Sequence, residues 1–113
     1  MDDEGFPAEW LRGALGLSVL GALRDGPTYG YALSQRLEKA GLGVIKGGTL
    51  YPLLARLEAD GLVTAQWQLS ESGPGRKYFS LTSTGRSTLA ARRNRWQRLA
   101  AIVASLTSDE EQS

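Results

Sequence analysis

The sequence predicts a mainly α-helical domain that carries a small β-hairpin and ends in a long helix. Three observations predict this fold. Three segments of helical apolar spacing fill the first half of the chain, a segment of strict alternation precedes a turn rich in Gly and Pro, and a helical run closes the chain. With 113 residues and no long linker, the chain has the length of one domain.

The first two helices are separated by a tight turn. Apolar residues between Trp10 and Arg24 cover more than one helical stripe, which predicts a helix buried on two sides. The run Asp25-Gly26-Pro27 ends this helix, because Pro cannot continue it. We expect Thr28 to cap a second helix, whose apolar spacing continues until Gly41.

A third helix and a hairpin follow. The spacing of Leu50, Leu53, Leu54 and Leu57 predicts a helix that ends at Gly61. Pro52 is tolerated only in a first turn, which predicts an N-cap at Gly48 or Thr49. Alternation then predicts a half-buried strand, a loop over residues 70–75 and a returning strand from Arg76 to Leu81; the residues expected on the buried face are Val63, Ala65, Trp67 and Leu69.

The last helix is predicted to run from Thr82 for about 25 residues, which is too long for a core of this size. Arg92 interrupts an apolar seam on it, formed by Leu89, Trp96, Leu99, Val103 and Leu106. The predicted organisation is an acidic tail (1–9), a helical domain with its hairpin (10–81), a dimerisation helix (82–107) and a second acidic tail (108–113).

The composition excludes several classes of function. Cys and His are both absent, which removes thiolate nucleophiles, Ser-His-Asp triads and nearly every structural zinc site. We therefore expect a protein that is not an enzyme and has no cofactor and no metal. Gly, Arg or Ser breaks the longest apolar stretches within a few residues, and the first residues are acidic, so we expect no membrane segment and a cytoplasmic location.

Charge is distributed unevenly along the chain. Seven of the 12 acidic residues lie near the two ends, whereas all 13 Lys and Arg lie between Trp10 and Thr107. Only five acidic residues share that stretch, which leaves it with a net charge of +8. A basic body favours polyanions through phosphate neutralisation. A solvated basic surface without a partner is the alternative.

Three helices followed by a hairpin form the order of a winged helix-turn-helix, in which the third helix enters the major groove of double-stranded DNA. Glycines let the backbone approach phosphates, hydroxyl groups and Pro contact base edges, and basic residues bind phosphates. The residues predicted to contact DNA are Tyr29, Tyr31, Lys46, Gly47, Gly48, Thr49, Tyr51, Pro52, Arg56, Arg76 and Lys77. Thr49 and Tyr51 also have structural interpretations, as a helix cap and as a packing residue.

The sequence resembles the PadR family of transcriptional regulators over most of its length. The matching segments are Leu11-Arg12-Gly13, Gly26-Pro27-Thr28-Tyr29-Gly30-Tyr31, Gly48-Thr49-Leu50-Tyr51-Pro52, Arg56-Leu57-Glu58, Gly61-Leu62, Gly75-Arg76-Lys77-Tyr78-Phe79, Leu81-Thr82 and Gly85. The single helix after the hairpin resembles the short subgroup of the family. The resemblance implies a homodimeric bacterial repressor of an inverted-repeat operator, with the last helix packed on the first helix of the partner.

This implied interface gives Trp96 two interpretations. We expect a dimer interface that contains Trp10, Leu11, Leu15, Leu89, Trp96, Leu99, Val103 and Leu106. In some short relatives an aromatic residue in this helix stacks on flat ligands, which makes a flat aromatic effector the second interpretation, with walls formed by Trp96, Trp10, Leu99 and Val103. A winged-helix module that binds protein instead of DNA remains the alternative function.

Overall fold

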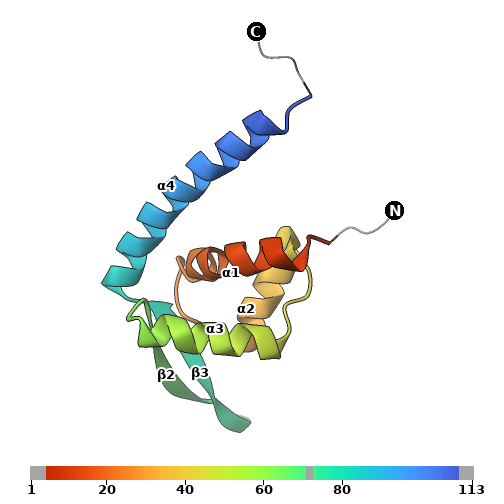
Figure 1. The fold of residues 1–113 in the computed structure, drawn as a ribbon. Helices are drawn as coiled ribbons and strands as arrows, with labels where there is room; N and C mark the ends of the chain where they lie inside the picture. The colour runs from red at the N-terminus through yellow and green to blue at the C-terminus, as the bar shows by residue number, and fades with distance from the viewer. Residues whose placement is uncertain (1–4, 71–72, 110–113) are drawn as a thin grey trace.

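Helices and a small sheet follow one another in the computed structural model, which describes residues 5–70 and 73–109 (Figure 1). The elements are α1 (Ala8–Ala22), β1 (Thr28–Tyr29), α2 (Gly30–Leu37) with a widened turn (Glu38–Leu42), α3 (Gly47–Ala59), β2 (Val63–Ser70), β3 (Gly73–Leu81) and α4 (Ser83–Leu106). The predicted mainly helical fold with a hairpin is confirmed. The helix α1 begins before Trp10, so Ala8 and Glu9 belong to it and not to the predicted tail.

One apolar core joins α1, α2, α3 and the base of the sheet. Its fully buried side chains are Val19, Leu20, Leu23, Leu33, Leu50, Leu54 and Val63. Leu50, Leu53, Leu54 and Leu57 of α3 are all buried, as their spacing predicted. Burial of each such side chain contributes about 1.5–3 kcal/mol, so this leucine stripe fixes which face of α3 points outward.

The turn between α1 and α2 forms a third strand that the sequence analysis missed. Thr28 is buried and pairs with Phe79, and Tyr29 pairs with Tyr78, which gives an antiparallel sheet of order β1-β3-β2 among the described residues. The prediction that Thr28 caps α2 is therefore wrong. The predicted end of this helical segment at Gly41 is confirmed, because Gly41 has φ of 114°, in the left-handed region.

The helix α3 begins earlier than predicted. Its N-cap is Lys46, and Thr49 makes no side-chain capping bond, so the predicted N-cap at Gly48 or Thr49 is wrong. Pro52 lies past the first turn. The N–H that proline lacks would have bonded to the carbonyl of Gly48, so α3 gives up one intrahelical hydrogen bond.

The hairpin β2–β3 extends beyond the helices (Figure 1). Val63 pairs with Leu81 and Ala65 with Phe79 over the core, and Trp67 pairs with Lys77 further out. The prediction that Trp67 and Leu69 are buried is wrong, since they are 72% and 96% exposed. Their side of the strand continues past the end of the core. The strands also reach further than predicted, to Ser70 and from Gly73; residues 71 and 72 lie outside the described residues.

The base of α4 is fixed against the body. Thr82 caps α4, because its hydroxyl oxygen accepts a hydrogen bond from the Gly85 N–H at 2.9 Å. A Cβ at Gly85 would overlap the carbonyl oxygen of Leu62, so only glycine allows this contact. Arg86 of α4 donates to the Arg24 carbonyl at 3.2 Å, just beyond the end of α1. The predicted start of the helix at this position is confirmed.

Beyond its base, α4 leaves the body. Leu89 is buried, but every described residue after it is exposed. Figure 1 shows the helix pointing away from the hairpin, past α1. No helix among residues 5–70 and 73–109 is both long enough and apolar enough to cross a membrane.

Candidate nucleic-acid interface

The first turns of α3 present most of the predicted contact residues on the surface. The four core leucines turn inward, and the predicted residues between them are exposed: Lys46, Gly47, Gly48, Thr49, Tyr51, Pro52 and Arg56. Because Thr49 makes no capping bond, its hydroxyl group is not used for the start of the helix. A Cβ at Gly48 would meet nothing within 4 Å, so this part of the backbone is open to an approaching group.

Tyr51 is positioned by a glycine of α2. A Cβ at Gly30 would overlap the Tyr51 hydroxyl group, so the ring lies directly on the backbone at the start of α2. A Cβ at Gly47 would be 3.4 Å from the same ring. Tyr51 remains 51% exposed despite these contacts. Both its structural interpretation and its predicted role on the surface are therefore compatible with its position.

Aromatic rings and charges connect the hairpin to the helices. The guanidinium of Arg76 lies 4.4 Å from the centroid of the Tyr29 ring, and Tyr29 meets Tyr78 edge to face at 5.4 Å. Lys77 reaches across to α3, where its Nζ is 4.0 Å from Glu58 Oε1. A cation over an aromatic face contributes about 0.5–1 kcal/mol at an exposed site. These contacts position the two basic side chains of the hairpin β2–β3, which we call the wing, next to the helices.

The hairpin, α2 and α3 enclose a hollow of about 520 Å³, which we call the wing cleft. Its lining joins five of the predicted residues to three others: Tyr29, Gly30, Tyr31, Tyr51, Trp67, Gly75, Arg76 and Lys77. Tyr31 is exposed, and its hydroxyl group accepts a hydrogen bond from Gln35 at 3.1 Å. Trp67 is the member that sequence reasoning missed as a site residue, since its alternation with Val63 and Ala65 indicated the core.

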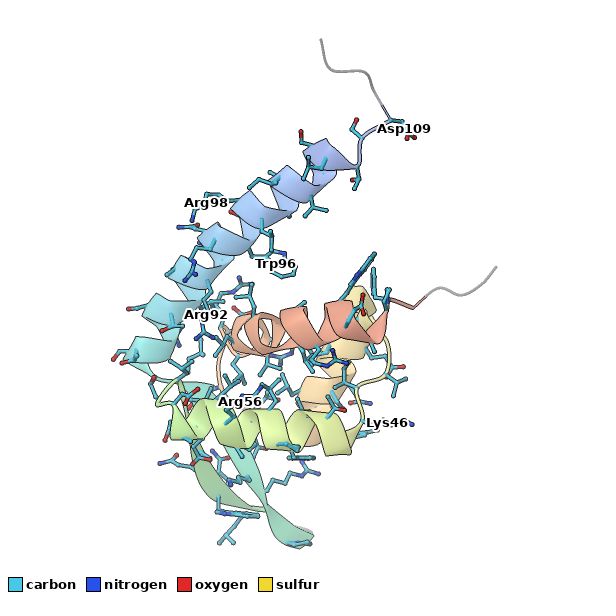
Figure 2. All side chains as sticks on the ribbon, in the orientation of Figure 1. Lys46, Arg56, Arg92, Trp96, Arg98 and Asp109 are labelled. Atoms are coloured by element: carbon cyan, nitrogen blue, oxygen red, sulfur yellow. The ribbon has the colours of Figure 1, made fainter. Side chains whose placement is uncertain are left out.

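Four of the six other predicted residues lie on a second side of α3. Lys46, Thr49, Pro52 and Arg56 line a hollow of about 470 Å³ between α3 and α1, where Arg12 joins them. Figure 2 shows Lys46 at the start of α3 and Arg56 further along it, toward α4. Nine of the eleven predicted residues therefore line one of two hollows beside α3, and Gly47 and Gly48 line neither.

A separate apolar groove lies between α1 and the outer part of α4. It has a volume of about 640 Å³ and brings together Trp10, Trp96, Leu99 and Val103, the four walls predicted for a flat ligand. Leu11 also lines it, and Leu106 is exposed further along α4. Leu15 and Leu89 are different, because both are already buried in the chain's own core.

Comparison with known proteins identifies the family. A sequence model described as the transcriptional regulator PadR-like family matches residues 19–91, which is more than half of the chain. The chain belongs to the PadR-like family. It is 37% identical over 95 residues to the transcriptional regulator Rv3488 of Mycobacterium tuberculosis, and the match covers 84% of this chain and 87% of that protein.

Solved structures of PadR-like regulators have the same fold. A PadR family transcriptional regulator from Eggerthella lenta has 38% identity and a TM-score of 0.81, with 91% of this chain and 89% of that chain covered. A PadR-like regulator from Bacillus cereus has 31% identity and a TM-score of 0.80, with 90% and 99% covered. The chain is thus a PadR-family transcriptional regulator, and the predicted resemblance is confirmed. These relatives are regulators rather than enzymes, in agreement with the sequence analysis.

Proposed function

We propose that this PadR-family regulator binds double-stranded DNA as a homodimer and represses transcription by occupying an inverted-repeat operator. The observation that carries the proposal is the wing cleft, where Tyr51 of α3 meets Arg76 and Lys77 of the hairpin on one exposed surface. Hydroxyl groups suit base edges and phosphates, and basic side chains suit phosphates. None of the residues that line the cleft is acidic.

In the proposed complex, the first turns of α3 enter the major groove. The core leucines hold the inner side of α3, so Gly48, Thr49 and Tyr51 face the bases. Arg76 and Lys77 then reach the adjacent backbone from the wing. Two copies related by a two-fold axis contact half-sites about 34 Å apart, one helical turn of DNA.

The apolar groove supports the homodimer. Trp10 is 61% exposed, and Leu99, Ile102 and Val103 of α4 are at least half exposed. An exposed stripe of large apolar side chains is costly in water and marks an interaction site. A second copy of α4, crossing α1 of its partner, covers this stripe. The interface proposed from the structure contains Trp10, Leu11, Trp96, Leu99, Val103 and Leu106.

We also propose that a flat aromatic effector relieves the repression. Trp96 and Trp10 line one groove, which suits the stacking of a planar ring. If a small molecule enters between the two subunits there, it changes the angle between their α4 helices and hence the separation of the two α3 helices. If Trp96 and Trp10 served only to pack the two subunits together, no ligand would be required.

Fluorescence anisotropy in a salt series tests DNA binding. Labelled DNA from upstream of the protein's own gene is compared with a scrambled fragment of equal length. We expect tight binding of the native fragment only, with affinity falling about 10³–10⁵-fold between about 50 and 200 mM salt. Equally weak binding of the native and the scrambled fragment would count against a specific operator.

The wing has its own test. Replacing both Arg76 and Lys77 by Ala removes two phosphate contacts, so we expect all DNA sequences to bind more weakly and the salt slope to flatten by about one to two units. Lys39→Ala and Arg93→Ala together are the charge-matched control, since neither residue lines the wing cleft. Loss confined to the specific site would mean that the wing reads bases.

A protein-binding winged helix is the second candidate function. The exposure of Trp67 and Leu69 favours it, because large apolar side chains on a projecting hairpin suit a protein partner. The salt series separates the two candidates. An apolar protein interface lacks the steep salt slope of phosphate binding.

A further inference from the structure

A fourth hollow lies where α1, α3 and α4 converge, and it shares Trp96 and Leu99 with the apolar groove. It has a volume of about 680 Å³, and we call it the arginine hollow. Its basic lining comes from three helices: Arg12, Arg56, Arg92, Arg95 and Arg98. Figure 2 shows Arg56 and Arg92 in the angle between these helices, with Trp96 on the side of α4 that faces α1.

The charges of the arginine hollow are not balanced within the described chain. Its lining contains no acidic residue, and none of the five guanidinium groups forms an ion pair with another residue of 5–70 or 73–109. Asp109 lies at the far end of α4 (Figure 2). Five like charges around one hollow repel one another, so an anion that enters it is attracted by all five.

The lining also specifies what kind of anion fits. Arginine forms bidentate hydrogen bonds with phosphate, and five positive charges exceed what a single carboxylate balances. Trp96, Leu99 and Ile102 form an apolar wall beside the arginines, and Trp96 offers a ring face for stacking. We infer that the arginine hollow binds a nucleotide-class ligand, a flat ring that carries at least two phosphate charges.

Such a ligand connects the hollow to the DNA surface. Arg56 belongs to α3, and it lines both the arginine hollow and the hollow beside the α3 entrance. A bound phosphate therefore attracts a side chain of the proposed recognition helix toward α4. The ring position at Trp96 is the one proposed above for a flat effector, so the inference rests in part on the proposed function, whereas the arginine lining belongs to this hollow.

Isothermal titration calorimetry without DNA tests the binding. The full chain is titrated with nucleoside diphosphates of all four bases, with the four corresponding nucleosides, and with pyrophosphate. We expect at least one diphosphate to bind more tightly than about 1 mM and at least about tenfold more tightly than either its nucleoside or pyrophosphate. The absence of binding by all four diphosphates overturns the inference, and equal binding of pyrophosphate overturns the assignment of the ring to Trp96.

Arginine variants locate the site. Arg92→Gln and Arg95→Gln each remove one charge-assisted contact, so each should weaken the bound diphosphate at least about tenfold. Arg93→Gln is the matched control, because Arg93 lies on the same helix but outside the lining. Equal losses in Arg92→Gln and Arg93→Gln would overturn the site.

Operator binding by the same variants, measured without nucleotide, separates the two proposals. If Arg92→Gln and Arg95→Gln weaken DNA binding and no diphosphate binds, the arginines serve the flanks of the DNA, and the nucleotide inference fails while the proposed function stands. If a diphosphate binds and no operator is found, the inference stands and the proposed function fails.

Discussion

The wing cleft and the apolar groove are built in opposite ways. The aromatic residues of the cleft are held by contacts within the chain: Tyr51 lies on Gly30, and Arg76 stacks on Tyr29. In the groove, Trp10 and the outer residues of α4 are largely exposed. A surface held in place without a partner suits a rigid ligand such as duplex DNA. A surface that leaves large apolar groups in water is complete only when something covers it.

The largest expected effect is a loss of stability, which would remove the wing cleft and the apolar groove together. Leu54 lies on the inner face of α3 and is fully buried, and Leu54→Ala should destabilise the fold by about 2–5 kcal/mol through lost burial and the cavity left behind. Urea unfolding followed by circular dichroism measures this loss. Ala55→Ser, at an exposed position of the same helix, is the control and should change stability little. A loss below about 1 kcal/mol for Leu54→Ala would contradict the core assignment.

A charge placed in the apolar groove tests that surface without altering the wing cleft. Leu99→Glu places a carboxylate on the stripe of α4, so we expect the dimer to dissociate while the body stays folded. Size-exclusion chromatography with light scattering measures the mass, and circular dichroism checks the fold. Gln97→Glu adds the same charge outside the lining of the groove and should leave the dimer intact. A monomeric wild-type chain would remove the proposed interface.

Truncation of Tyr51 tests the wing cleft alone. Tyr51→Ala should weaken operator binding about tenfold or more, since one good contact to a base contributes about 1–3 kcal/mol, and should leave the dimer unchanged. Anisotropy with the operator fragment measures it. Tyr51→Phe retains the ring on Gly30 and removes only the hydroxyl group, so it separates packing from hydrogen bonding. Unchanged binding by Tyr51→Ala would remove this residue from the site.

The smallest expected effect on stability is at Trp67. Because the side chain is 72% exposed, Trp67→Ala should change the free energy of unfolding by about 0.5 kcal/mol or less. Thermal unfolding measures this change, and operator affinity measured on the same sample shows whether DNA uses the ring. A large destabilisation would mean that the hairpin packs on the body after all.

The sequence analysis succeeded where spacing and burial agree. Leu50, Leu53, Leu54 and Leu57 share one helical face, and that face has no alternative position except the core. Thr82 was correctly placed as the start of α4, where the structure shows its hydroxyl oxygen accepting a hydrogen bond from the Gly85 N–H. Both signals depend on residues close together in the chain.

The sequence analysis failed where the position of a residue depends on how far the hydrophobic core extends. Alternation indicates that Trp67 shares a face with Val63, but it does not tell where the core beneath that face ends. The strand β1 has two residues, too few for any periodicity, and it exists because β3 pairs with it. An apolar seam likewise cannot separate Leu89, which packs on its own chain, from Leu99, which faces outward.

The close contact of Gly85 with Leu62 fixes the rotational phase of α4 as well as its position. Each residue of a helix turns the next by about 100°, so the spacing from Gly85 to Trp96 decides which side of α4 carries the apolar stripe. One residue inserted after Leu89 would carry that stripe about a quarter of a turn away from α1 without altering a single side chain. Variation in length between these two points should therefore be far less tolerated than variation in residue type.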